Sequence, residues 1–214
     1  MSKGFLAIIA AVVIVFIGIF AFSGHKNNSN NGKSSSSNGS PTNHIEGKGQ
    51  TGVTLVEYGD YECPYCEEYY PIVKQVVAKY NDQIKFQFRN FPLVSIHQNA
   101  FAGARAAEAA AAQSKFWQMH DLLYDNQNQW AQSKNPTQYF KQYAQQLGLD
   151  VTQFNKDYSS NAVNDAINAD MAAGNKLNIQ GTPTFFLDGK QINVTASASS
   201  FETQIQQAIN QKKS

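Results

Sequence analysis

Glu62-Cys63-Pro64-Tyr65-Cys66 holds the only two cysteines of this 214-residue chain, spaced as Cys-x-x-Cys. The stretch before it, 53–59, has the β-branched and aromatic composition of a strand. After it, apolar residues recur at helical spacing. A dithiol placed where a strand passes into a helix lies among the free N–H groups of the helix N-terminus, which favour a thiolate. The motif therefore predicts thiol–disulfide chemistry.

A structural or a metal-binding role fits the two cysteines less well. A structural disulfide between residues three apart would close too short a loop to restrict the unfolded chain much. A zinc site needs four ligands, and His97 and His120 do not complete a standard zinc spacing with the cysteines. We therefore favour a redox-active pair.

Helix geometry assigns a role to each residue of the motif. Cys63 would lie at the N-cap with an exposed sulfur and act as the nucleophile, and Pro64 fits the first helical position. Cys66 would be more buried and resolve the mixed disulfide. Tyr65 adds a phenol without positive charge. Nearby acids oppose the effect of the helix, so we expect a moderately lowered pKa of Cys63; they are Asp60, Glu62, Glu67 and Glu68.

Two further places are candidates for the site. Glu57 lies in the strand before the motif, where it is either an outward surface acid or a buried carboxylate that relays the proton of Cys66. Thr182-Pro183 precedes a strand, so Pro183 is either an edge proline or a cis proline that faces the dithiol. In the second case the backbone of Thr182 would pair with a substrate chain as an added strand does.

The order of the expected elements defines the fold class. Strands over 53–58 and 84–89 flank a helix with Pro71 inside it, a β-α-β unit that favours parallel strands. A helical block follows over about 97–177, and then a hairpin around Asp188-Gly189 and a last helix from Ser200. Without the block this is a thioredoxin-like α/β core, so we predict a thioredoxin-like fold with a helical insertion.

The N-terminus differs from the rest. Residues 4–22 are apolar over 19 positions, about 28 Å as a helix, and we expect a transmembrane signal anchor behind a cytoplasmic tip of residues 1–3. A cleaved signal peptide is the alternative. An Asn/Ser/Gly-rich linker over 23–43 then leads to a domain over 44–214. Lys3 favours the N-terminus inside, so the domain would lie outside the cytoplasm, where disulfides persist.

Composition excludes some partners. The net charge is +1 and apolar residues make up 42% of the chain, which suits a packed core and gives no sign of nucleic-acid binding.

Four stretches together resemble the DsbA family, in its membrane-anchored bacterial branch with a Thioredoxin_4-type domain. They are Val56 to Cys66, Asn90-Phe91-Pro92-Leu93 with His97, Lys115-Phe116-Trp117 with His120-Asp121, and Gly181 to Phe185. The resemblance covers about residues 44–212. Glu57 matches the family's buried acid, and Thr182-Pro183 match its cis-proline pair. The strongest oxidants of the family carry His between the cysteines, where this chain has Tyr65.

The resemblance implies an extracytoplasmic enzyme at the cell membrane of a bacterium that gives disulfides to exported proteins. It also implies reoxidation by a quinone-linked membrane partner of the DsbB or VKOR type. We expect no cofactor beyond the Cys63–Cys66 disulfide and no metal. A thiol–disulfide reductase or isomerase remains open, as does a non-catalytic peptide-binding chaperone module.

Overall fold

The structure is a computed structural model that describes residues 39–213. The predicted tip and anchor, and the linker up to residue 38, lie outside the described residues. No helix within 39–213 is both long enough and apolar enough to cross a bilayer.

The folded domain includes residues before His44. The predicted linker, which ran to residue 43, therefore extends too far. Thr42 is buried, and its N–H and hydroxyl donate to the Asp170 carboxylate at 2.8 and 2.6 Å. Its carbonyl accepts from Gln87. Thr42 therefore belongs to the folded domain.

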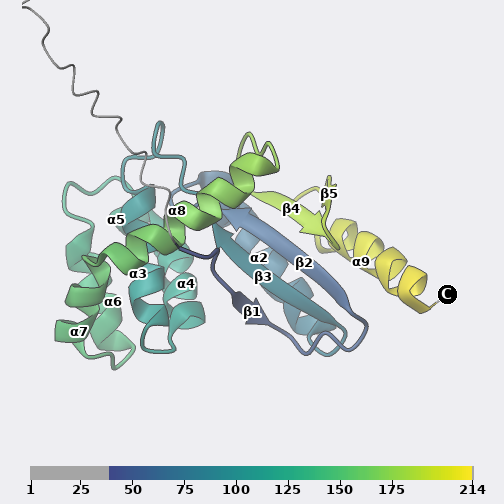
Figure 1. The fold of residues 1–214 in the computed structure, drawn as a ribbon, viewed down its shortest axis with the longest axis horizontal. Helices are drawn as coiled ribbons and strands as arrows, with labels where there is room; N and C mark the ends of the chain where they lie inside the picture. Colours follow the sequence, from purple (N-terminus) through teal and green to yellow (C-terminus); the bar gives the residue numbers. More distant parts are fainter. Residues whose placement is uncertain (1–38, 214) are drawn as a thin grey trace, which may run out of the picture. The chain divides into compact units, whose positions relative to one another are not determined.

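A five-stranded mixed sheet in the order β1-β3-β2-β4-β5 forms the centre (Figure 1). Its strands are β1 (His44–Glu46), β2 (Val53–Gly59), β3 (Ile84–Asn90), β4 (Thr184–Leu187) and β5 (Lys190–Ile192). Only β2 and β3 pair in parallel, in agreement with the predicted β-α-β unit. The thioredoxin-like fold is thus confirmed.

Helices α2 (Pro64–Tyr80) and α9 (Ala198–Lys213) pack on one face of the sheet. The apolar core on this face takes side chains from β2, β3 and β4 as well as from both helices. Pro71 lies inside α2, as predicted, and on the exposed side of the helix. The helix continues past this proline to Tyr80. This packing fixes the start of α2, and so the cysteines, against the end of β2.

Six helices separate β3 from β4, where we predicted the insertion. They are α3 (Ala100–Ala111), α4 (Phe116–Asp125), α5 (Gln127–Trp130), α6 (Thr137–Gln146), α7 (Val151–Tyr158) and α8 (Asn161–Lys176). In Figure 1, α3 to α7 gather beside the sheet and α8 runs back over it toward β4. Asp150 caps α7, accepting from Gln153 N at 2.9 Å.

The alanine-rich α3 lies at the centre of the helical group. It contacts α4, α6, α7 and α8, because small side chains on several faces allow close approach. Gly103 of α3 packs so tightly that a Cβ there would lie 2.9 Å from the Trp130 ring and 3.1 Å from Tyr61 Cβ. The helical group therefore packs directly on the segment that leads into the cysteines.

Candidate active site

The two cysteines differ sharply in their surroundings. Cys63 is the N-cap of α2 and Pro64 occupies its first turn, as predicted. Cys66 has no exposed surface, and Cys63 is only 4% exposed. The prediction of an exposed Cys63 sulfur is therefore wrong, and the difference in access between the two is smaller than expected. Both are free thiols here.

The cause of Cys63's burial is the segment before β4. The Thr182–Pro183 peptide bond is cis, as predicted, and the Cys63 thiol donates to the Thr182 carbonyl at 3.4 Å. The Thr182 hydroxyl is buried and has no hydrogen-bond partner of its own among residues 39–213. Cys63 Sγ thus contacts the backbone of Thr182, a residue 119 positions away in the sequence.

Local donors stabilise the Cys63 thiolate. A hydrogen bond from the Cys66 thiol is the largest effect, and the backbone N–H groups of Cys66 and Tyr65 add to it. Together they lower the pKa of the Cys63 thiol to about 6, although burial opposes them. The predicted lowering is supported, and the donors come from the helix N-terminus that the sequence indicated.

The Cys66 thiol is shifted the other way. Burial raises its pKa well above the ordinary value, and the neighbouring Cys63 and Glu57 charges raise it further. The Asp60 backbone N–H, which donates to Cys66 Sγ at 3.4 Å, partly opposes this rise. At neutral pH the pair is therefore one thiolate and one thiol.

Glu57 is buried, so the alternative of an outward surface acid is wrong. It is 3% exposed on the face of β2 that α2 covers. Burial raises the pKa of its carboxyl to about 8, and the charge of Cys63 contributes. A cavity of about 60 Å³ beside it is lined by Tyr70, Lys74 and His120, among others. Glu57 is thus a neutral acid near the dithiol, next to a small polar space.

The predicted acids around the motif do not act as a group. Asp60 and Glu62 are buried and accept backbone N–H groups, Asp60 from Glu62 and Leu93 and Glu62 from Asn99. Because these carboxylates are satisfied locally, they hold the loop more than they repel the Cys63 thiolate.

Several residues of the site were not predicted from the sequence. His97, which only the family resemblance connected to the site, donates from Nδ1 to Asp60 at 2.7 Å. Gln127 of α5 donates to the carbonyls of Tyr61 and Cys63 at 2.8 and 3.0 Å and is buried. The only sequence signal was His97 after the Asn90-Phe91-Pro92-Leu93 stretch, while Gln127 carries none.

His120 is a packed, buried residue. Its Nδ1 lies 3.1 Å from the Tyr61 hydroxyl, within a cluster of aromatic rings, and burial lowers its pKa to about 3. Among residues 39–213 no group of three or more His, Cys, Asp or Glu side chains is placed to hold a metal ion.

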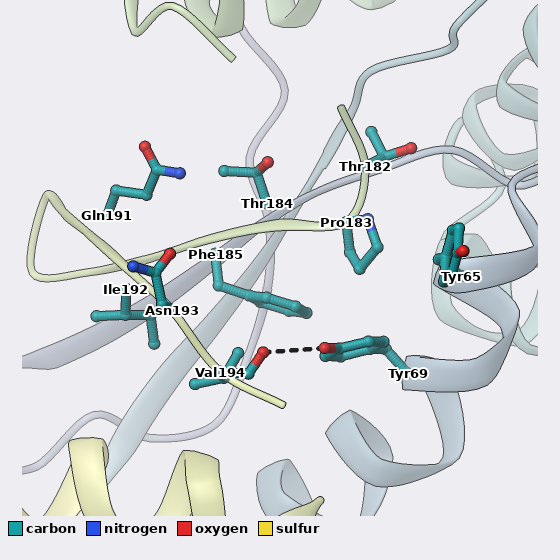
Figure 2. A pocket seen from close by; sticks show the side chains of 10 residues that line it. All are labelled: Tyr65, Tyr69, Thr182, Pro183, Thr184, Phe185, Gln191, Ile192, Asn193 and Val194. Atoms are coloured by element: carbon teal, nitrogen blue, oxygen red, sulfur yellow. Dashed lines mark hydrogen bonds between the residues drawn. The ribbon is translucent and has the colours of Figure 1, made fainter. Parts of the chain in front are cut away.

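A groove of about 370 Å³ adjoins the dithiol (Figure 2). Tyr65, which is 66% exposed, stands across from Pro183, and the Tyr69 hydroxyl donates to the Val194 carbonyl at 2.9 Å. The walls combine the rings of Tyr65, Tyr69 and Phe185 with polar side chains from β5 and the residues around it. The groove offers an extended chain a surface of aromatic rings and polar side chains next to Thr182, which contacts Cys63.

A thioredoxin fold whose helix N-terminus carries a Cys-x-x-Cys dithiol against a cis proline defines the class of thiol–disulfide oxidoreductases. The thioredoxin family profile Thioredoxin_4 matches residues 39–207, and the chain belongs to this family. The predicted relationship to DsbA-type proteins is confirmed at this level.

Solved structures agree with the assignment. A thioredoxin-like oxidoreductase from Silicibacter pomeroyi is 27% identical, with a TM-score of 0.65 over 80% of this chain and 92% of its own. BdbD from Bacillus subtilis in its oxidised form is 23% identical, with a TM-score of 0.70 over 80% of this chain and 97% of its own. The likeness to BdbD shows the shared fold.

Several curated proteins with similar sequences are named as Na⁺/H⁺ antiporters. The Na⁺/H⁺ antiporter NhaA 3 of Salinispora tropica is 36% identical over 148 residues, which cover 69% of this chain and 22% of the antiporter. The chain thus spans about a fifth of the length of the curated relatives it matches.

Proposed function

We propose that this protein is an extracytoplasmic thiol–disulfide oxidoreductase that introduces disulfide bonds into exported proteins through Cys63 and Cys66. The observation that carries the proposal is the opposite shift of the two thiols. Hydrogen bonds from the Cys66 thiol and from backbone N–H groups at the start of α2 lower the pKa of Cys63 to about 6, and burial raises that of Cys66. Such a pair has one good leaving group, Cys63, and one thiol that holds its proton.

The first step opens the enzyme's disulfide. A substrate thiolate attacks Cys63 Sγ, an intermolecular S–S bond forms, and the Cys63–Cys66 bond breaks. Cys66 Sγ leaves with the electron pair and takes a proton. Glu57 is the proposed donor of that proton, because with a pKa of about 8 its carboxyl is neutral at pH 7.

The second step releases the product. A second substrate thiolate attacks the substrate sulfur of the mixed disulfide, the substrate disulfide forms, and Cys63 leaves as its stabilised thiolate. The substrate loses two electrons and two protons, and the enzyme gains both electrons. The reduced enzyme then returns these electrons to an oxidant, for which we propose a quinone-linked membrane partner of the DsbB or VKOR type.

The cis-proline segment and the groove would hold the substrate. The Thr182 carbonyl, which faces Cys63, is placed to accept from the N–H of an extended substrate chain. Pro183 and Tyr65 face each other at one side of the groove, and Pro64 begins the helix that presents the sulfur. Substrate side chains next to the reacting cysteine would lie on this surface.

The magnitude of the Cys63 shift favours an oxidant of intermediate strength. A pKa of about 6 in place of 9 stabilises the reduced enzyme at pH 7 by roughly 1.4 kcal/mol, on the order of 30 mV. The groups at the helix N-terminus thus stabilise the reduced enzyme modestly and favour transfer of its disulfide to a substrate. This supports an oxidase weaker than one with a cationic residue at position 65.

The proposed location outside the cytoplasm rests on the N-terminal sequence. The apolar residues 4–22 and the polar linker after them support a membrane-anchored, single-pass protein whose catalytic domain lies outside the cytoplasm.

The redox state of Cys63 and Cys66 in growing cells tests the proposal. Free thiols are trapped with acid and alkylated with a mass-tagged maleimide, and the mobility of the full chain is compared with a Cys63→Ser, Cys66→Ser control. An oxidase is expected to be mostly disulfide. A mostly dithiol population would indicate a reductase, and normal cellular function of the double variant would favour a binding module.

A further inference from the structure

The Asp60 side chain connects two loops beneath the dithiol. It is 1% exposed, and its Oδ1 accepts from Glu62 N at 2.8 Å. Its Oδ2 accepts from Leu93 N at 2.9 Å and from His97 Nδ1 at 2.7 Å. Three donors on one carboxylate identify it as the ionised acceptor, so the proton between Asp60 and His97 belongs to Nδ1.

The backbone of the same residue touches the resolving sulfur. The Asp60 N–H donates to Cys66 Sγ at 3.4 Å and acts against the rise of the Cys66 pKa. The carboxylate and the N–H of Asp60 are attached to the same Cα. The hydrogen bonds that hold the carboxylate therefore also hold the direction of the N–H. His97 is the only one of the three donors that is a side chain and can be changed without altering the backbone.

The loop that carries His97 is itself well anchored. Asn99 N donates to the Glu62 carboxylate, and the Asn99 side chain donates to the carbonyls of Ala131 and Ser133 at 2.8 and 2.9 Å. His97 is 17% exposed, so it approaches Asp60 from the rim of the site. The backbone that carries the ring is therefore anchored independently of the contact between His97 and Asp60.

We propose that His97 is a positioning residue for thiol exchange: its Nδ1–H holds Asp60 so that the Asp60 N–H points at Cys66 Sγ. When the Cys63–Cys66 bond breaks, Cys66 Sγ takes the electron pair in a water-free environment. A fixed N–H lowers the energy of that developing charge. Without His97, the buried Asp60 carboxylate loses a charge-assisted partner and the loop relaxes away from the sulfur.

The inference rests on thiol exchange at Cys63 and Cys66, and not on the direction of exchange or the compartment proposed above. Two variants separate the donor from the rest of the ring. His97→Asn keeps an N–H donor close to the Nδ1 position without a charge, whereas His97→Ala removes the donor. Ser95→Ala is the matched control, since Ser95 lies exposed in the same loop.

The test uses the full chain, oxidised, with reduced glutathione as the probe. Stopped-flow measurement gives the rate at which the Cys63–Cys66 disulfide opens, and redox titration gives the equilibrium constant with glutathione. His97→Ala is expected to slow opening about tenfold and to leave the equilibrium constant within about twofold of the wild type, because reduced Cys66 holds its proton and carries no charge for the N–H to stabilise. His97→Asn and Ser95→Ala should remain within about twofold of the wild type in both measurements.

A wild-type rate of opening in His97→Ala would overturn the inference, and so would an equal loss in His97→Asn. If His97→Ala does not fold, the comparison of His97→Asn with wild type decides, because a slow asparagine variant contradicts a role as donor. A wild-type chain that does not react with glutathione would overturn the thiol chemistry itself, a failure distinct from that of His97.

Discussion

Glu57 is a carboxyl group whose burial costs stability. Its pKa is raised from 4.5 to about 8, so folding disfavours its ionised form. The unfolded chain loses the proton near pH 4.5 and the folded chain near pH 8, and stability therefore falls as the pH rises between these values. We expect Glu57→Gln to raise the free energy of unfolding of the reduced protein by about 2–3 kcal/mol at pH 7.

Urea unfolding of the wild type and Glu57→Gln at several pH values measures this difference. It should shrink toward zero below pH 4.5, where Glu57 is neutral in both states. Exposed Glu68→Gln is the control and should change little. The gain should come with slower opening of the disulfide, since glutamine cannot give Cys66 a proton. A Glu57→Gln chain that is less stable than wild type at pH 7 would contradict a neutral, buried Glu57.

Gln127 secures the loop that carries Cys63. Its amide is the donor to two buried carbonyls, those of Tyr61 and Cys63. Gln127→Leu has a similar size but leaves both carbonyls without this donor, so we expect a loss of about 1–3 kcal/mol in the free energy of unfolding. Thermal unfolding followed by circular dichroism measures the loss, and Gln129→Leu at an exposed position is the control. Equal melting temperatures of the two variants would show that the loop does not depend on Gln127.

The residues that react could be predicted from the sequence, whereas most of those that support them could not. Cys63, Cys66 and Pro183 stand in local patterns whose spacing reflects a strand, a turn and a helix start. Gln127 and His97 act through contacts across 64 and 37 positions, and a single chain without such a local pattern does not reveal them. The burial of Cys63 was missed for the same reason, because residue 182 covers it.

At the scale of elements, α8 packs on the sheet through a glycine. A Cβ at Gly174 would lie 2.7 Å from the Phe91 ring and 3.2 Å from Tyr58. We expect Gly174→Ala to lower the free energy of unfolding by about 1–2 kcal/mol, because the clash with buried rings exceeds the gain in helix propensity. Chemical denaturation tests this, with Gly181→Ala, where a Cβ meets nothing within 4 Å, as the control. A stabilised Gly174→Ala chain would show that the rings can move aside.

The elements that carry their own periodicity or turn signal were predictable, and two short ones were not. The sequence pattern located β2, β3, the hairpin of β4 and β5, and the helical block between β3 and β4. β1 has three residues, with Ile45 partly exposed, and exists through its antiparallel pairing with β3. α5 has four residues and is held by the burial of Gln127 and Trp130. Tertiary contacts decide such elements, so local sequence does not indicate them.

At the scale of the whole molecule, the proposed anchor and linker would determine where the dithiol works. We expect protease added to intact protoplasts to cut within residues 23–38 and to release a fragment that contains the folded domain, because this polar stretch offers no core. Immunoblotting with a C-terminal tag follows the fragment, and a cytoplasmic protein must stay intact as the control. Resistance of the chain until the protoplasts are lysed would place the domain inside.

The fold makes Cys63 a thiolate at neutral pH by means of the Cys66 thiol and the N–H groups at the start of α2. Titration of the reduced full chain, followed by thiolate absorbance at about 240 nm, measures this pKa. A midpoint of about 6 is expected in the wild type, and a midpoint shifted toward 9 in Cys66→Ala, which lacks the largest of the stabilising hydrogen bonds. A wild-type midpoint at or above 9, the ordinary value for cysteine, would contradict the claim.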